Sequence, residues 1–320
     1  MRLRKDRVAG VVLALAGVVM APAASAQDHP ASPPPSETTA AAATAEQPET
    51  ILFIGNSFTY GGHSAAWRYR ADSVTDLNGD GVGGVPALFK LFTVEAGLDY
   101  AVSLETSGGK TLGWHWDHRR DVVDRSWDHV VLQDLSTFTR DNPGDPATLI
   151  AYARKFANLF KRANPDVDIS MIATWSRPDL TYIAGKRWSG QPITRMAEDI
   201  RAGYDKAKAE IPAIGTIHPV GQAFSRAIAD GVADPDPYDG IAFGQIDLWT
   251  YDQYHASSAG YYLEALVIFA DVTGCDPTGF GRDEIAASEL GISPLAAVAL
   301  QRVAQQTTGA SRVCTAVPAQ

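Results

Sequence analysis

The sequence lacks an excess of basic residues, a long apolar run in its body, and all but two cysteines. Its formal net charge is −10 at pH 7, which argues against a nucleic-acid backbone as a partner. No segment after the first 26 residues is apolar enough to span a membrane. A Gly-x-Ser-x-Gly motif is also absent, which argues against the nucleophile elbow of an α/β-hydrolase. The charge fits a soluble exported protein and says little about the substrate.

The first 26 residues match a secretory signal peptide. They have a basic start, an apolar stretch over residues 8–20, and a small-residue cleavage site at residues 24–26. The apolar stretch is shorter than the roughly 20 residues of a spanning helix. We therefore expect a secreted or periplasmic protein with no membrane span after cleavage, and an uncleaved N-terminal anchor is the alternative. No cysteine lies near the cleavage site, so a lipid anchor is not expected.

Residues 27–48 are rich in Ala, Pro, Ser, Thr and Glu, and contain almost nothing large and apolar. Such a segment cannot bury enough surface to offset its ordering entropy, so we expect a disordered linker. Residues 49–320 are numerous enough for one large α/β domain with a full core. They contain no internal repeat and no second linker, and we expect a single domain.

Short apolar runs alternate with amphipathic stretches along this domain. The runs predict strands at residues 50–54, 100–104, 129–135 and 167–173, and a weaker one at 214–217. The stretches predict helices at residues 86–96, 146–162, 192–211, 220–229, 257–272 and 294–306. Alternating strands and helices indicate a mostly parallel sheet with helices on both faces. Right-handed crossovers then bring the strand ends to a shared edge.

Ser57 follows the first of these strands, in the segment Ile-Gly-Asn-Ser-Phe-Thr at residues 54–59. An apolar run that ends in Gly-Asn-Ser predicts a strand running into a tight turn, which places a hydroxyl at the carboxyl end of the sheet. Taken alone, Ser57 is better interpreted as a helix N-cap. However, Asp252 and His255 stand three positions apart later in the chain, and the three side chains are the parts of a hydrolytic triad.

Acyl transfer also needs donors aimed at the developing oxyanion. The backbone N–H of Ser57 is one candidate, and the glycine turn at residues 107–111, with Gly109, offers another. Gln133 stands where the third strand runs out and is the candidate for a third donor. Ser136 or Thr137 could also reach this position.

These blocks resemble, in their order, those of the SGNH/GDSL hydrolases, over residues 50–273. The resemblance implies a flavodoxin-like three-layer α/β/α sandwich with a mostly parallel sheet of about five strands. It implies an esterase, lipase or carbohydrate O-deacetylase that needs no cofactor, with Ser57 as nucleophile, His255 as base and Asp252 as its orienter. It also implies the N–H groups of Ser57 and Gly109 as oxyanion donors. The chain departs from the family in having Gly-Asn-Ser in the first block and no Gly-x-Asn-Asp after the third strand, where Gln133 stands.

A segment at residues 76–81 is similar to the opening of a calcium loop, with oxygen-bearing Asp76, Asn78 and Asp80 at alternate positions. The twelfth position holds Ala87 in place of a bidentate glutamate, so an EF-hand is not expected. A polar turn is the preferred interpretation, and a looser calcium site is the alternative.

Several aromatic and polar residues are candidates for substrate contact. Asn56 flanks the nucleophile, and Trp114 and His115 lie in an aromatic segment beside Gly109. Trp175 follows the fourth strand, where its ring could stack on a sugar or pack a loop. No cysteine or Glu-x-x-His partner accompanies the histidines at 115 and 118, so a zinc site is not expected.

Two further expectations concern structure. His218 is expected to be a structural or cleft-lining residue. Cys275 and Cys314 are expected to form a disulfide if the chain is exported, and two separate thiols are the alternative.

The sequence therefore predicts an exported serine esterase that hydrolyses carboxylic esters, with O-acetyl groups of a polysaccharide or glycoside as the leading substrate. No cofactor and no nucleic-acid partner are expected. The alternatives are a lipase or short-chain esterase, and a non-catalytic carbohydrate-binding protein on the same fold.

Overall fold

Six parallel strands form one sheet in the computed structural model, which describes residues 47–314. The strands are β1 (Glu49–Gly55), β2 (Thr75–Asp76), β3 (Tyr100–Thr106), β4 (His129–Leu132), β5 (Asp168–Ile172) and β6 (Ile214–His218). Their spatial order is β2-β3-β1-β4-β5-β6. Apart from the two-residue edge strand β2, this is the 2-1-3-4-5 order of flavodoxin-like folds. The predicted fold class is confirmed, and its five strands are all present.

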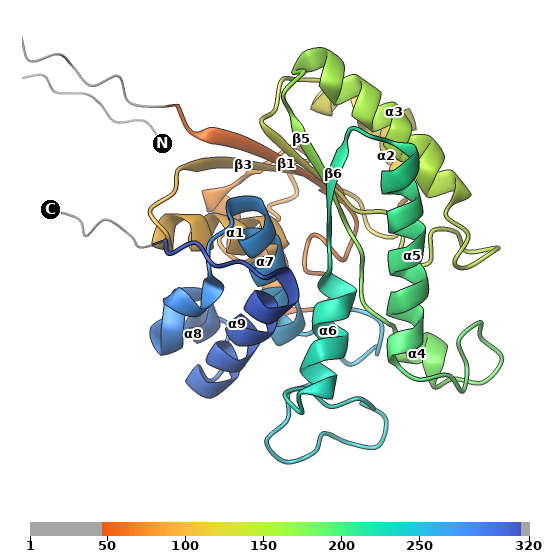
Figure 1. Cartoon of the computed structure of the whole chain (residues 1–320), viewed down its shortest axis with the longest axis vertical. Helices are drawn as coiled ribbons and strands as arrows, with labels where there is room; N and C mark the ends of the chain where they lie inside the picture. The colour runs from red at the N-terminus through yellow and green to blue at the C-terminus, as the bar shows by residue number, and fades with distance from the viewer. Residues whose placement is uncertain (1–46, 315–320) are drawn as a thin grey trace, which may run out of the picture. The chain divides into compact units, whose positions relative to one another are not determined.

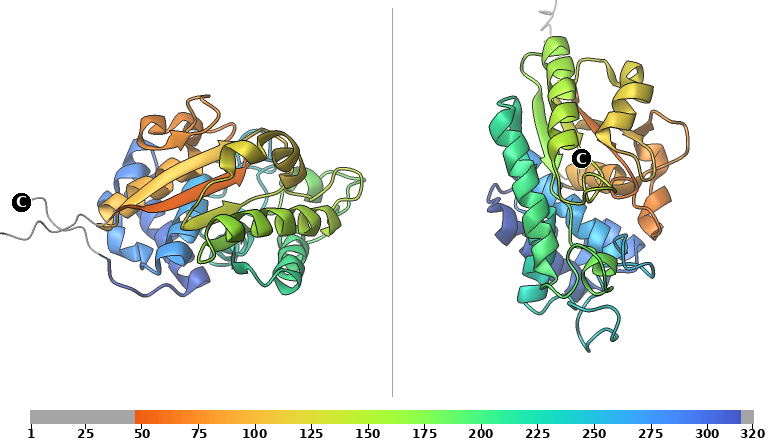
Figure 2. Two further views of the ribbon diagram at one scale, coloured as in Figure 1. Left: turned by 90° about the horizontal axis from the view of Figure 1, so that it is seen from above. Right: turned by 90° about the vertical axis from the view of Figure 1, so that its right-hand side faces the viewer.

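Helices cover both faces of the sheet (Figure 1). The α-helices are α1 (Gly84–Glu95), α2 (Leu112–Val123), α3 (Ala147–Ala163), α4 (Pro178–Thr181), α5 (Thr194–Glu210), α6 (Val220–Ala229), α7 (Ser258–Thr273), α8 (Ile285–Glu289) and α9 (Pro294–Thr308). Helices α1, α6, α7 and α9 share one hydrophobic cluster with the sheet, and α2, α3 and α5 share the other. Figure 2 shows this arrangement from two further directions.

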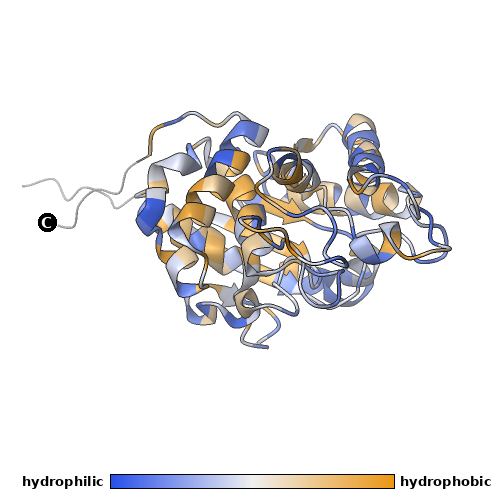
Figure 3. Ribbon diagram, turned by 90° about the horizontal axis from the view of Figure 1, so that it is seen from below, coloured by the Kyte–Doolittle hydropathy of each residue, from blue (hydrophilic) through white to orange (hydrophobic). Residues whose placement is uncertain are grey.

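The alternation of side chains along β1 explains the two clusters. Ile51 and Phe53 pack into the first cluster, whereas Leu52 and Ile54 pack into the second, and all four are buried. Successive side chains of a strand point to opposite faces, so an unbroken apolar run is required where both faces are covered. Figure 3 shows the apolar residues gathered along the strands and the inner helix faces.

The sequence prediction missed α2, because its segment Leu-Gly-Trp-His-Trp-Asp-His-Arg-Arg carries little apolar periodicity. It also extended β4 by three residues, whereas the strand ends at Leu132. The predicted signal peptide at residues 1–26, and the linker at 27–48 except for its last two residues, lie outside the described residues. Within residues 47–314, no helix is both long and apolar enough to cross a membrane.

A disulfide closes the end of the domain. Cys275 follows α7 and is bonded to Cys314, with the two Cα atoms 5.6 Å apart. The backbone of Arg312 pairs with that of Cys275, so the tail lies alongside the end of the helix. The structure thus contains the disulfide and not the two separate thiols.

Candidate active site

Ser57 lies in a tight turn directly after β1. The carbonyl of Asn56 accepts hydrogen bonds from the backbone N–H groups of Thr59 and Tyr60, both at 3.0 Å. The turn leaves Ser57 at the carboxyl end of the sheet, with 5% of the residue exposed. Strand β1 lies between β3 and β4, where the winding of the sheet reverses. Ligands of parallel α/β sheets bind at this switch point.

The structure brings Ser57, His255 and Asp252 together as a hydrogen-bonded chain. The Ser57 Oγ lies 2.9 Å from the His255 Nε2. On the other side of the imidazole, the His255 Nδ1 lies 2.6 Å from the Asp252 Oδ2. A nucleophile bonded to a base, with the base oriented by a carboxylate, is the arrangement that activates a serine.

The acid and the base come from one loop before α7, and local hydrogen bonds fix that loop. The Asp252 Oδ1 accepts from the backbone N–H groups of Tyr254, at 3.0 Å, and His255, at 2.9 Å. Ser257 caps α7 by accepting from the Gly260 N–H. Asp252 therefore positions both the side chain and the backbone of the base.

The environment of Asp252 and His255 favours the protonation states that a catalytic pair would need. Burial lowers the pKa of His255 below its ordinary value, although Asp252 opposes this shift. Burial alone would raise the pKa of Asp252, but the hydrogen bonds from His255 and Tyr254 outweigh it and leave the pKa lowered. At neutral pH the imidazole is therefore neutral and able to take a proton, and the carboxylate is ionised.

Two backbone N–H groups are available to an oxyanion. Among residues 47–314, the N–H groups of Ser57 and Gly109 have no backbone acceptor. Gly109 has a φ of 67°, in the left-handed region that favours glycine. The Ser107 N–H donates to the Gly55 carbonyl at 3.0 Å, which ties the glycine turn to the end of β1. The predicted oxyanion residues Ser57 and Gly109 thus lie on adjoining turns.

Gln133 supports the nucleophile turn, and its amide is not free to act as a third donor. The Gln133 Oε1 accepts from the Asn56 N–H at 2.9 Å and from the Thr59 Oγ1 at 3.1 Å. Its Nε2 donates to the carbonyl of the neighbouring Asp134. The side chain is fully buried. The Gln133 oxygen faces the turn that carries Ser57, because the Asn56 N–H in that turn needs an acceptor. The Gln133 Nε2 is then already bonded to a backbone carbonyl.

Asn56 is a buried link between loops, whereas we expected it to contact substrate. Its Nδ2 donates to the carbonyls of Lys110, at 3.0 Å, and Asp134, at 3.3 Å. Its Oδ1 accepts from the Phe58 N–H at 3.2 Å. Asn56 thereby joins the turns after β1, β3 and β4, on which the candidate catalytic groups lie.

Trp175 is fully buried, so it cannot stack on a sugar. Its ring lies between those of Phe58, at a centroid distance of 4.1 Å, and Phe224, at 5.0 Å. Its Nε1 donates to the Tyr254 carbonyl at 3.2 Å. The strand edge was predicted correctly, but the side chain points into the core, where it holds the loop that carries His255.

The predicted contacts on α2 differ from each other. His115 is buried and lies 2.5 Å from the Glu105 carboxylate, so it is a structural residue and not a substrate contact. Trp114 is half-buried and stacks on His118, with the ring centroids 4.7 Å apart. Trp114 remains a candidate contact on the α2 side of Gly109.

The loop similar to a calcium site is explained by a polar turn. Both carboxylate oxygens of Asp76 accept backbone N–H groups, from Asn78 and Asp80 at 2.9 Å and from Val82 at 3.1 Å. The Asn78 Nδ2 donates to the Thr106 carbonyl at 2.7 Å. Asp76 is therefore committed to the backbone of its own loop.

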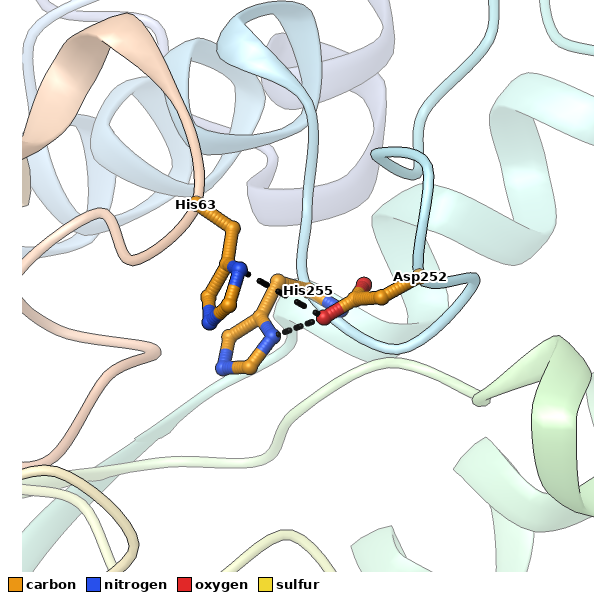
Figure 4. Close-up of side chains that lie close together, drawn as sticks. All are labelled: His63, Asp252 and His255. Carbon is orange, nitrogen blue, oxygen red and sulfur yellow. Dashed lines mark hydrogen bonds and ion pairs between the residues drawn. The ribbon is translucent and has the colours of Figure 1, made fainter.

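His63 is a residue of the site that the sequence analysis missed. Its imidazole stacks on that of His255, with the centroids 4.3 Å apart, and its Nδ1 lies 3.9 Å from the Asp252 Oδ2 (Figure 4). Its Nδ1 also lies 2.7 Å from the Tyr251 hydroxyl. His63, Asp252 and His255 form the one group of histidine and carboxylate side chains in residues 47–314 that is compact enough to hold a metal ion. A cation there would compete with the His255 proton for Asp252 and so disrupt the triad.

A second Ser-His-Asp set occurs in the core. The His218 Nε2 lies 2.9 Å from the Ser170 Oγ, and its Nδ1 lies 3.0 Å from the Asp271 carboxylate. Ser170 and His218 are buried on β5 and β6. This placement gives His218 the structural role predicted for it, because no ester can reach it.

Comparisons with known proteins agree with this architecture. No protein-family model matches the chain, and no curated protein matches it. A solved structure of a DUF4886 family protein from Bacteroides uniformis superposes with a TM-score of 0.55 at 18% identity, covering 81% of this chain and 94% of that one.

Two further solved structures overlap less closely. A phospholipase A1 from Streptomyces albidoflavus gives a TM-score of 0.46 at 12% identity, covering 71% of this chain and 99% of that one. A psychrotrophic esterase from a Pseudoalteromonas species gives 0.44 at 12% identity, covering 70% and 97%. The fold conclusion depends on the Bacteroides structure and on the strand order of this chain. The chain has the α/β fold of the Bacteroides structure, and its five longer strands follow the 2-1-3-4-5 order of flavodoxin-like folds.

Proposed function

We propose that this protein is an exported serine esterase that removes O-acetyl groups from carbohydrates. The observation that carries the ester hydrolase activity is the chain of contacts from the Ser57 Oγ through His255 to Asp252, at 2.9 and 2.6 Å. Bonded groups of these types at the switch point of a parallel sheet are suited to nucleophilic acyl transfer.

The reaction follows from the positions of these groups. The Ser57 Oγ attacks the ester carbonyl while the His255 Nε2 takes its proton. The N–H groups of Ser57 and Gly109 donate to the oxyanion, and Asp252 stabilises the imidazolium. Collapse expels the alcohol, which receives the proton from His255. Water, deprotonated by His255, then attacks the acyl-enzyme and releases the acid and the free serine.

The nearly buried Ser57, with 5% of the residue exposed, supports a small acyl group such as acetyl. Export is supported by the signal-peptide pattern of residues 1–26 and by the Cys275–Cys314 disulfide, since disulfides persist in oxidising compartments. The mass of the mature protein recovered from periplasm or medium tests this: an intact N-terminus on protein retained in the cytoplasm would contradict export.

The core Ser-His-Asp set provides a matched control for the catalytic one. We expect a fluorophosphonate probe to label Ser57, and Ser57→Ala to abolish labelling and reduce ester hydrolysis on the order of 10⁴-fold or more. Ser170→Ala removes a serine with the same histidine geometry from a buried position, and should retain labelling and activity. Full turnover by folded Ser57→Ala protein would refute the assignment.

A binding protein on the same fold is the second candidate. It is favoured by the commitment of the Gln133 amide to the backbone, which leaves the oxyanion with one donor fewer than the family pattern implies. The same labelling experiment separates the two functions, because a fluorophosphonate reacts only with an activated serine. Absence of label on folded wild-type protein would favour binding without catalysis.

A further inference from the structure

A cavity of about 350 Å³ lies beside the nucleophile turn. Its volume is within the range of about 300–1,000 Å³ typical of small-molecule sites. Residues from three separate segments line it, among them Tyr60, Trp67, Arg68, Asn78, Asp80 and Gly108. The first segment follows Ser57, and the last contains the residue before Gly109. The cavity is therefore bounded by the same two turns that supply the candidate oxyanion donors.

The ring of Tyr60 forms the wall nearest the nucleophile. A Cβ atom on Gly62 would lie 2.9 Å from the Ser57 Cβ and 3.1 Å from the Tyr60 ring. A Cβ atom on Gly108 would lie 2.8 Å from the Tyr60 hydroxyl. Tyr60 thus fills the space between the Ser57 turn and the glycine turn. A molecule in the cavity would lie against the Tyr60 ring, beside the Ser57 turn.

Trp67 extends this aromatic wall towards solvent. Its ring stacks with that of Tyr60 at a centroid distance of 5.5 Å and an interplanar angle of 29°, and the residue is 40% exposed. The Arg68 side chain donates to the carbonyls of Asp80, at 3.1 Å, and Gly81, at 3.2 Å, which holds the two sides of the cavity together. The Arg68 guanidinium carbon also lies 5.5 Å from the centroid of the Trp67 ring. The exposed part of this ring suits the C–H groups of a sugar.

The opposite wall is polar and contains an unpartnered acceptor. The Asn78 Nδ2 donates to the Thr106 carbonyl at 2.7 Å, which fixes the amide. The Asn78 Oδ1 is buried and has no hydrogen-bond partner among residues 47–314. Asp80 is an exposed residue of this wall and offers an acceptor for hydroxyl groups.

We propose that this cavity binds the sugar ring of the ester, the alcohol portion, with Trp67 stacking on the ring and Asp80 accepting its hydroxyl groups. This inference rests on the esterase function proposed above. It assigns to Trp67 the sugar contact that the sequence analysis assigned to Trp175. The acetyl group then lies on the side of Ser57 and the oxyanion donors.

Two acetate esters with different alcohols test the proposal. A mono-O-acetylated methyl glycoside has a ring that can reach Trp67, whereas ethyl acetate has an alcohol too small to do so. We expect Trp67→Ala to raise KM for the glycoside about tenfold, which corresponds to about 1.4 kcal/mol, and to leave kcat/KM for ethyl acetate within about twofold. Trp67→Phe should recover part of the loss, because it restores an aromatic face.

Phe243→Ala is the matched control, because Phe243 is fully exposed and does not line the cavity. Phe243→Ala should leave the KM and kcat for both esters unchanged. If Trp67→Ala protein does not fold, Asp80→Ala on an exposed loop provides the same comparison. Equal losses on both esters, or no loss on either, would overturn the sugar subsite. So would a Trp67→Ala effect that grows with acyl length in a series of ethyl esters, since the cavity would then hold the acyl chain. Wild-type protein that hydrolyses neither ester would instead refute the esterase function.

Discussion

Replacing His63 by asparagine should reduce activity in acid and leave it unchanged in alkali. The His63 imidazole stacks on that of the base at 4.3 Å, so two protonated rings would repel each other. Burial lowers the pKa of His255, Asp252 opposes this shift, and His63 and Arg177 add smaller lowering effects. Removing His63 therefore raises the pKa of His255, and a larger fraction of the base is protonated and inactive at acidic pH.

The magnitude follows from the separation of the rings. The His63 side chain is 44% exposed, so a water-like dielectric applies, and two charges 4.3 Å apart then interact by about 1 kcal/mol. This corresponds to roughly a fivefold lower kcat/KM for His63→Asn on the acid limb. Asparagine suits the site because His63 has a φ of 64°, in the left-handed region that asparagine tolerates.

The assay is the pH profile of kcat/KM for ethyl acetate at fixed ionic strength. His118→Asn is the control, because His118 is exposed and stacks on Trp114, away from the triad. Its profile should match that of wild type. Added salt should narrow the difference between His63→Asn and wild type, since an exposed charge is screened. An acid limb that does not move, or that moves to lower pH, would refute the electrostatic role of His63.

Two further predictions concern the supports of the site and the end of the domain. Gln133→Leu leaves the Asn56 N–H and the Thr59 hydroxyl without their acceptor, so we expect about 1–3 kcal/mol of lost stability and a kcat at least about tenfold lower. Thermal unfolding and steady-state kinetics measure both, and a wild-type kcat for the leucine variant would contradict the support role. Cys275→Ser should cost about 2–4 kcal/mol of unfolding free energy with kcat/KM unchanged, because Cys275 follows the far end of α7, about 24 Å from His255 along the helix. Denaturant unfolding with and without reductant checks this, and a midpoint insensitive to reductant would contradict it.

The sequence was sufficient to place the candidate triad. The residues of the triad follow a strand or precede a helix at the carboxyl edge of the sheet, and the order of the strands determines which segments meet at that edge. Ser57 follows a run that is apolar at every position, which identifies a doubly covered strand and its carboxyl end. Asp252 and His255 precede the cap of a helix, and their spacing lets one carboxylate hold both the ring and the backbone of the base. A parallel sheet brings these distant segments to one edge.

Side-chain direction at that edge could not be predicted. Trp175 and Gln133 both follow strands at the correct end, yet each points into the protein, where Trp175 fills the space between two aromatic rings and Gln133 meets the Asn56 N–H. His63 depends on a positive φ and on a partner nearly two hundred residues away. These placements are set by packing between elements, which the pattern of a single strand or helix does not contain.

The two Ser-His-Asp sets show why the triad alone does not define the function. Both sets have 2.9 Å between serine and imidazole, and the imidazole-to-carboxylate distance is 3.0 Å for His218 and Asp271 against 2.6 Å for His255 and Asp252. The difference is position: Ser170 lies within β5, where its neighbours are sheet and core, and Ser57 lies on a turn beside two unbonded backbone N–H groups and a cavity. Catalysis requires that a substrate carbonyl reach the serine Oγ, and that hydrogen-bond donors stabilise the negative charge that develops on the carbonyl oxygen. Access and oxyanion donors, more than the triad, are therefore the reasons to propose Ser57 and not Ser170 as the nucleophile.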